Sequence, residues 1–202
     1  DVIHDQLRRA TDRRVSLSDI YAALKMPPIG LKSGPIPVLV MAVLIATSDE
    51  VALYEHGTFR PLLTEEICDR LVRNPGHFEI KHFANATGDR RAVVETTSAI
   101  LGVEPRFRKH RVGNVLAVVS ELVSRISALP RYTMQAEDLS DHARCVRDAI
   151  AVAVEPDELL FTSLPQAVSL SPIGLTPTDS SEVESFAQRL LEALDELADH
   201  YP

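Results

Sequence analysis

The sequence predicts a mainly α-helical protein with a winged-helix-like N-terminal unit, residues 1–85, that contains a small β-hairpin, followed by a helical bundle, residues 86–202. Apolar residues recur at helical spacing through most of the chain, whereas a single short segment alternates polar and apolar residues around a glycine turn. Hydrophobic residues make up 45% and charged residues 25%, as in ordinary globular domains. Tryptophan is absent, so aliphatic side chains must form the core.

Prolines and small polar residues delimit the first helices. Residues 2–10 have the composition of a short helix, and Ser16 or Ser18 is suited to cap a second one. The prolines at positions 27 and 28 end that helix, because a residue before proline avoids the α-helical region. Pro35 and Pro37 suit the first turn of the next helix, where a missing N–H group costs nothing.

The strongest apolar run in the chain extends from Ile36 to Ala46 and contains no charged residue. A membrane span needs about 20 apolar residues, so the run is too short to cross a bilayer. Because no rotation of this helix offers a polar face, we expect it to be buried on every side. Its lack of basic residues also argues against a DNA-reading recognition helix and favours a packing or assembly role.

A β-hairpin is predicted directly after this helix. Residues 50–55 alternate polar and apolar side chains, His56-Gly57 supplies a turn, and residues 58–62 form the returning strand. Pro61 places that strand at a sheet edge. Thr64 then begins a helix whose first carboxylates complement the helix dipole, residues 74–76 end it, and one more strand follows around residues 78–83.

The second half of the chain predicts a bundle. Asp89 can begin a helix that Gly102 closes, and the helix over residues 115–126 is apolar on more than one stripe, which predicts a central position. Two helices are expected from Ser140 to about residue 154 and after Pro156. Ser181 and Glu184 predict a capping box for the last helix, whose apolar residues recur at helical spacing.

The positive charge of the chain is clustered. The net charge is −8, yet residues 1–111 sum to +2 and residues 112–202 to −10. The segment from Arg90 to Arg111 contains six basic and two acidic residues, and Phe107 lies among the basic ones. The six basic residues are candidates for nucleic-acid or anion contact: Arg90, Arg91, Arg106, Arg108, Lys109 and Arg111. The basic loop, residues 105–111, could instead remain solvated or dock on the acidic half of the chain.

No pattern in the sequence predicts catalysis, a metal site or a cofactor. Cys68 and Cys145 lie far apart and belong to no short-spacing motif, so we expect reduced thiols. The glycines of residues 30–34 flank a helix start, but Pro35 and Pro37 remove anion-binding donors there, which favours a tight turn. Acidic residues stand where helices begin, which capping explains. We therefore expect a protein that is not an enzyme.

The segment PIGLKSGPIPVL, residues 28–39, followed by DEVALYE, residues 49–55, resembles an internal region of large bacterial ATP-binding proteins, some of which belong to DNA-modification or phage-defence systems. The similarity extends through Asn74-Pro75 and returns at residues 155–161. No G-x-x-x-x-G-K-[ST] motif occurs in this chain. The resemblance implies an accessory region whose ATPase lies elsewhere in a longer polypeptide.

These observations lead to one principal expectation and one alternative. We expect a non-catalytic interaction or assembly region of a larger cytoplasmic, ATP-dependent bacterial protein. Its partners would be other domains of a longer chain or further copies of itself, without a membrane. The alternative is a nucleic-acid-binding module that acts through residues 105–111.

Overall fold

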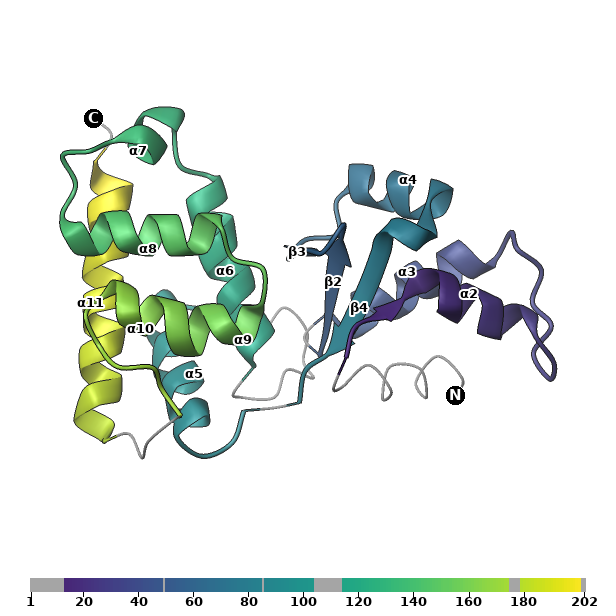
Figure 1. Ribbon diagram of the computed structural model, residues 1–202, viewed down its shortest axis with the longest axis horizontal. Coiled ribbons are helices and arrows are strands. Elements are labelled where there is room, and N and C mark those ends of the chain that lie inside the picture. The colour runs from purple at the N-terminus through teal and green to yellow at the C-terminus, as the bar shows by residue number, and fades with distance from the viewer. Residues whose placement is uncertain (1–12, 49, 85, 104–113, 175–178, 201–202) are drawn as a thin grey trace. The chain divides into compact units, whose positions relative to one another are not determined.

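The computed structural model describes residues 13–48, 50–84, 86–103, 114–174 and 179–200. Contacts within the chain divide it into two compact units, Asp1–Ala84 and Asn85–Pro202. The protein is mainly helical with one small antiparallel sheet, which confirms the predicted fold class (Figure 1). The short helix expected at residues 2–10 lies outside the described residues.

The described residues of the first unit form three helices and a four-stranded antiparallel sheet of order β1-β4-β2-β3 (Figure 1). The elements in chain order are β1 (Val15–Ser16), α2 (Leu17–Lys25), α3 (Ile36–Ala46), β2 (Val51–Glu55), β3 (Thr58–Arg60), α4 (Glu65–Arg73), the 3₁₀ turn η1 (Pro75–His77) and β4 (Phe78–His82). Helix α4 therefore separates the hairpin from β4, which returns between β1 and β2.

The predicted hairpin is confirmed. Tyr54 pairs with Phe59 across it, and the turn residues His56 and Gly57 both have positive φ angles, 50° and 79°. A two-residue turn of this kind matches the right-handed twist of the strands that it joins, and glycine adopts it without steric cost. Strand β3 lies at the sheet edge with Pro61 directly after it, as the missing N–H of proline requires.

One hydrophobic core holds the helices of the first unit to the sheet. It takes side chains from α2, α3 and α4 and from β1, β2 and β4, among them Leu17, Ile20, Ile36, Leu53, Leu71, Phe78 and Ile80. Ser16 caps α2 by accepting a hydrogen bond from the Ser18 N–H at 3.2 Å. Thr64 caps α4 by accepting one from the Ile67 N–H at 3.4 Å.

The second unit is a helical bundle. Its elements are α5 (Gly88–Leu101), α6 (Val115–Ser127), α7 (Arg131–Gln135), α8 (Asp141–Ala151), α9 (Pro156–Glu158), the π-helical turn η2 (Leu159–Ser163), α10 (Leu164–Ala167) and α11 (Ser180–Asp199). Helix α11 packs against both α5 and α8 (Figure 1). Helix α6 buries six apolar side chains and contacts α5 and α8, as its apolar pattern predicts.

Several local details of the bundle differ from the predictions. The capping box at Ser181 and Glu184 is wrong, because the N-cap of α11 is Asp179, two residues earlier, and the Ser181 hydroxyl donates to the Asp179 carboxylate at 3.1 Å. Helix α8 ends at Ala151 and leaves Val154 beyond it. The expected helix start at Ser140 is confirmed, and the Ser140 hydroxyl accepts a hydrogen bond from the Ala143 N–H at 3.2 Å. The glycine end at Gly102, with a φ angle of 62°, is confirmed as well.

Among the described residues, no helix combines the length and the apolar character that a membrane span needs.

Candidate interaction surface

Helix α3 begins and ends as its sequence dictates. Pro35 occupies the N-cap and Pro37 the first turn, where their missing N–H groups cost no helical hydrogen bond. At the other end, the backbone N–H and the side-chain hydroxyl of Thr47 both donate to the Val43 carbonyl, at 2.9 and 2.8 Å. These contacts fix an uncharged helix of eleven residues, about 16 Å long, on the core of the first unit.

Only one side of α3 is buried. Ile36, Val40 and Leu44 recur every four residues and lie in the core, and Met41 and Val43 are packed partly against it. On the opposite side Val38 is 66% exposed, Ile45 51% and Leu39 40%. The expectation that this helix is buried on every side is therefore wrong.

The exposed side of the helix forms a continuous apolar strip that we call the α3 outer face: Val38, Leu39, Ala42, Ile45 and Ala46. The spacing of these residues places them along one side of a helix. Single exposed apolar residues are ordinary on protein surfaces, whereas a contiguous group of large exposed apolar residues is a candidate interaction site.

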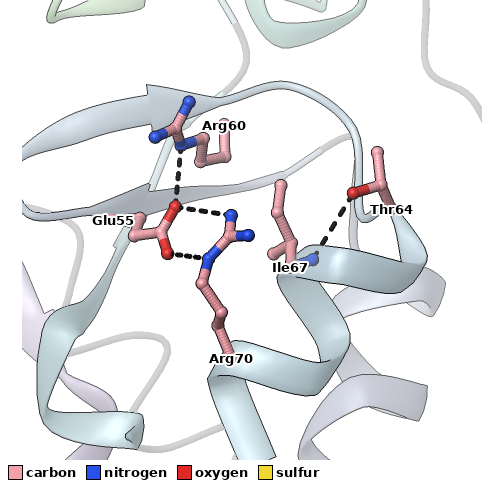
Figure 2. Close-up of polar contacts among 5 residues, drawn as sticks. All are labelled: Glu55, Arg60, Thr64, Ile67 and Arg70. Carbon is pink, nitrogen blue, oxygen red and sulfur yellow. Dashed lines mark hydrogen bonds and ion pairs between the residues drawn. The ribbon is translucent and has the colours of Figure 1, made fainter.

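The packing partner of α3 is itself held to the sheet by an ion-pair network at Glu55, which we call the Glu55 brace (Figure 2). Arg70 of α4 donates from Nε to Glu55 Oε1 at 2.5 Å and from Nη2 to Oε2 at 3.0 Å. Arg60 of β3 donates from Nε to Oε2 at 3.1 Å. The brace therefore connects β2, β3 and α4 through one carboxylate.

The electrostatics of the brace favour an ionised Glu55. Only 4% of the residue is exposed, so its charge needs partners, and the two arginines provide them. The hydrogen bond from Arg70 lowers the pKa of the Glu55 carboxyl, and burial of the carboxyl opposes this shift only in part. The same contact raises the pKa of Arg70. The brace is a structural element that holds α4, a neighbour of α3, against the sheet.

The candidate cations are only partly described, and those that are described have intramolecular partners. The Arg90 guanidinium stacks 4.7 Å from the centre of the Phe161 ring, and Arg91 Nε donates to Glu95 at 2.7 Å. The other four candidates, Arg106, Arg108, Lys109 and Arg111, lie outside the described residues, as does the rest of the loop at 105–111. Of the six candidates, the structure therefore places only Arg90 and Arg91.

The sequence pattern did not identify the α3 outer face because every residue of α3 is apolar. Amphipathic helices reveal their buried side through alternation with polar residues, and α3 has no such alternation. Side-chain size does not distinguish the two sides either, since Val38, Leu39 and Ile45 are exposed while Ile36, Val40 and Leu44 are buried.

Comparison with protein-family models, with curated proteins and with solved structures finds no match to this chain.

Adjacent residues on opposite sides of α3 give a matched pair of substitutions. Leu44→Asp places a carboxylate in the core and should prevent folding, because an unpaired buried charge costs several kcal/mol against a total stability of roughly 5–15 kcal/mol. Ile45→Asp should leave the melting temperature within a few degrees of wild type, since surface changes usually cost about 0.5 kcal/mol. Equal destabilisation by both variants in thermal melting would contradict one-sided packing.

The Glu55 brace predicts a pH-dependent stability difference. Because folding lowers the pKa of Glu55, the stabilisation is present above the unfolded value, about 4.3, and is lost as pH falls through the folded value. Glu55→Gln should cost about 1–2 kcal/mol at neutral pH, since the arginine partners are half-exposed. The free energies of unfolding of the wild type and of Glu55→Gln, measured with urea, should converge at acidic pH. A difference that grows on acidification would refute this interpretation.

The basic cluster predicts little affinity for nucleic acid. Arg90 and Arg91 have intramolecular partners and the chain carries a net charge of −8, so we expect no gel shift of DNA or RNA at micromolar protein and about 0.1 M salt. The opposing result is a shift that Arg108→Ala together with Lys109→Ala weakens equally for all sequences. That result would favour a nucleic-acid-binding module.

Proposed function

We propose that this chain is a non-catalytic interaction or assembly region of a larger cytoplasmic, ATP-dependent bacterial protein. The observation that carries the proposal is the α3 outer face, where large apolar side chains lie exposed on a helix whose two ends are defined by Pro35 and Thr47. Such side chains bind by leaving water and offer no group that transfers a proton or attacks a substrate. The resemblance of residues 28–39 and 49–55 to regions of ATP-binding proteins supports the wider setting.

The way in which the first unit holds α3 also supports this role. A docking helix must be held in position by contacts that its partner does not supply. Helix α3 has a core side with Ile36, Val40 and Leu44 fully packed, and its neighbour α4 is connected to the sheet through Glu55. The outer face is therefore presented without rearrangement, which limits the ordering cost of binding.

The coding sequence on either side of these residues tests whether the chain is part of a larger ATP-dependent protein. We expect the same open reading frame to encode a nucleotide-binding G-x-x-x-x-G-K-[ST] motif. In that parent protein, Ile45→Glu should reduce the mass of the assembled complex while each subunit keeps its ATP hydrolysis. Val152→Glu is a matched control, because Val152 is a 75% exposed apolar residue of the second unit.

Two results would contradict the proposal. An open reading frame that starts close to Asp1 and encodes no ATPase would contradict the proposal that this chain is part of a larger ATP-dependent protein. If Ile45→Glu leaves the mass of the assembled complex unchanged, as measured by light scattering beside the wild type, the α3 outer face is not the surface through which the complex assembles.

A further inference from the structure

We infer that the α3 outer face binds the same face of a second copy of this chain, with the two α3 helices antiparallel across a two-fold axis. The inference rests on the proposed function, since it names the partner of the same surface. It is carried by the distribution of charge around α3 and by the sizes of the side chains along it.

Neutrality makes the α3 outer face suitable for self-pairing. In a two-fold symmetric interface the same patch meets itself, so any uncompensated charge within it meets a like charge. Two copies of a chain with net charge −8 repel each other in general. Residues 33–48, which include all of α3, contain no charged side chain. Two copies can therefore approach along α3 without repulsion between like charges on these residues.

Described charged residues that flank the two ends of α3 select the antiparallel arrangement. Lys32 is exposed before the N-terminus of α3, and Glu50 is exposed after its C-terminus, where it also lies 3.9 Å from His82. Antiparallel pairing brings Lys32 of one copy to the end where Glu50 of the other copy lies. Parallel pairing would place Lys32 beside Lys32 and Glu50 beside Glu50, so that like charges would repel at both ends. Antiparallel helix dipoles favour the same arrangement.

Side-chain sizes are complementary in that arrangement. With the two-fold axis at Ala42, Val38 lies four residues before the axis and Ala46 four residues after it, so a large side chain faces a small one. Leu39 and Ile45 lie three residues on either side and face each other. The small side chain of Ala42 at the axis lets the helices approach closely, as ridges-into-grooves packing requires.

The area available predicts a weak dimer. Stable specific complexes bury about 800 Å² on each partner, and a helix face of this length supplies less than that. We therefore expect a dissociation constant in the micromolar range or above, so that self-association depends strongly on protein concentration. In an assembly that holds several copies together, the higher effective concentration would populate the pair.

Sedimentation velocity on the purified chain, from low micromolar to millimolar concentration, tests the pairing. The weight-average mass of the wild type should rise toward that of a dimer. Ile45→Glu should weaken the association by roughly tenfold or more, because the pair would bury two unpaired carboxylates. Val152→Glu adds the same charge to the second unit and should associate like the wild type.

A charge exchange tests the orientation. Lys32→Glu alone and Glu50→Lys alone should each weaken the dimer, whereas the double variant should recover most of the wild-type association, since opposite charges again meet at each end. Circular dichroism and melting of each variant establish that folding is retained. Failure of the double variant to recover would overturn the antiparallel arrangement.

The remaining outcomes separate this inference from the proposed function. A wild type that stays monomeric at every concentration overturns self-pairing, as does a dimer that Ile45→Glu leaves intact. If Ile45→Glu nevertheless disrupts the parent complex, the proposed function stands with a different partner on α3. If Ile45→Glu changes neither the chain nor the parent complex, both proposals fail.

Discussion

One-sided burial of α3 is the constraint on which the account of this protein depends. The helix is apolar around its whole circumference, but the small sheet and helices α2 and α4 can cover only the side that carries Ile36, Val40 and Leu44. Exposed Val38 and Ile45 leave apolar surface in water, a state that burial against a partner would make more favourable. The core side gives the helix its fixed place, and the outer side is the surface that we propose binds a partner.

The Glu55 brace illustrates how a small unit maintains such a surface. A core of this size contributes limited hydrophobic stabilisation, so a charge-assisted network that connects β2, β3 and α4 adds stability that aliphatic packing does not supply. Its carboxylate is buried while both guanidinium groups reach solvent. The charge is thereby compensated without complete desolvation of the three groups, which keeps the energetic cost of burial low.

The sequence predicted features that local chemistry determines. Pro35 and Pro37 marked the start of α3, His56-Gly57 marked the hairpin, and Gly102 marked the end of α5, since each residue type has a conformational or hydrogen-bonding reason to stand there. The predicted cap at Ser181 was wrong, because the N-cap of α11 is Asp179. The exposed side of α3 could not be predicted from periodicity, because tertiary packing alone distinguishes Leu44 from Ile45.

Thiol accessibility along α3 tests one-sided burial most directly. In a chain with Cys68 and Cys145 replaced by alanine, Leu44→Cys and Ile45→Cys place one thiol on either side of the same helical turn. In dilute native protein, where self-association is minimal, the Ile45→Cys variant should react with a thiol reagent at nearly the rate of unfolded chain, and the Leu44→Cys variant should react only through rare opening. Comparable protection of both thiols would contradict the account.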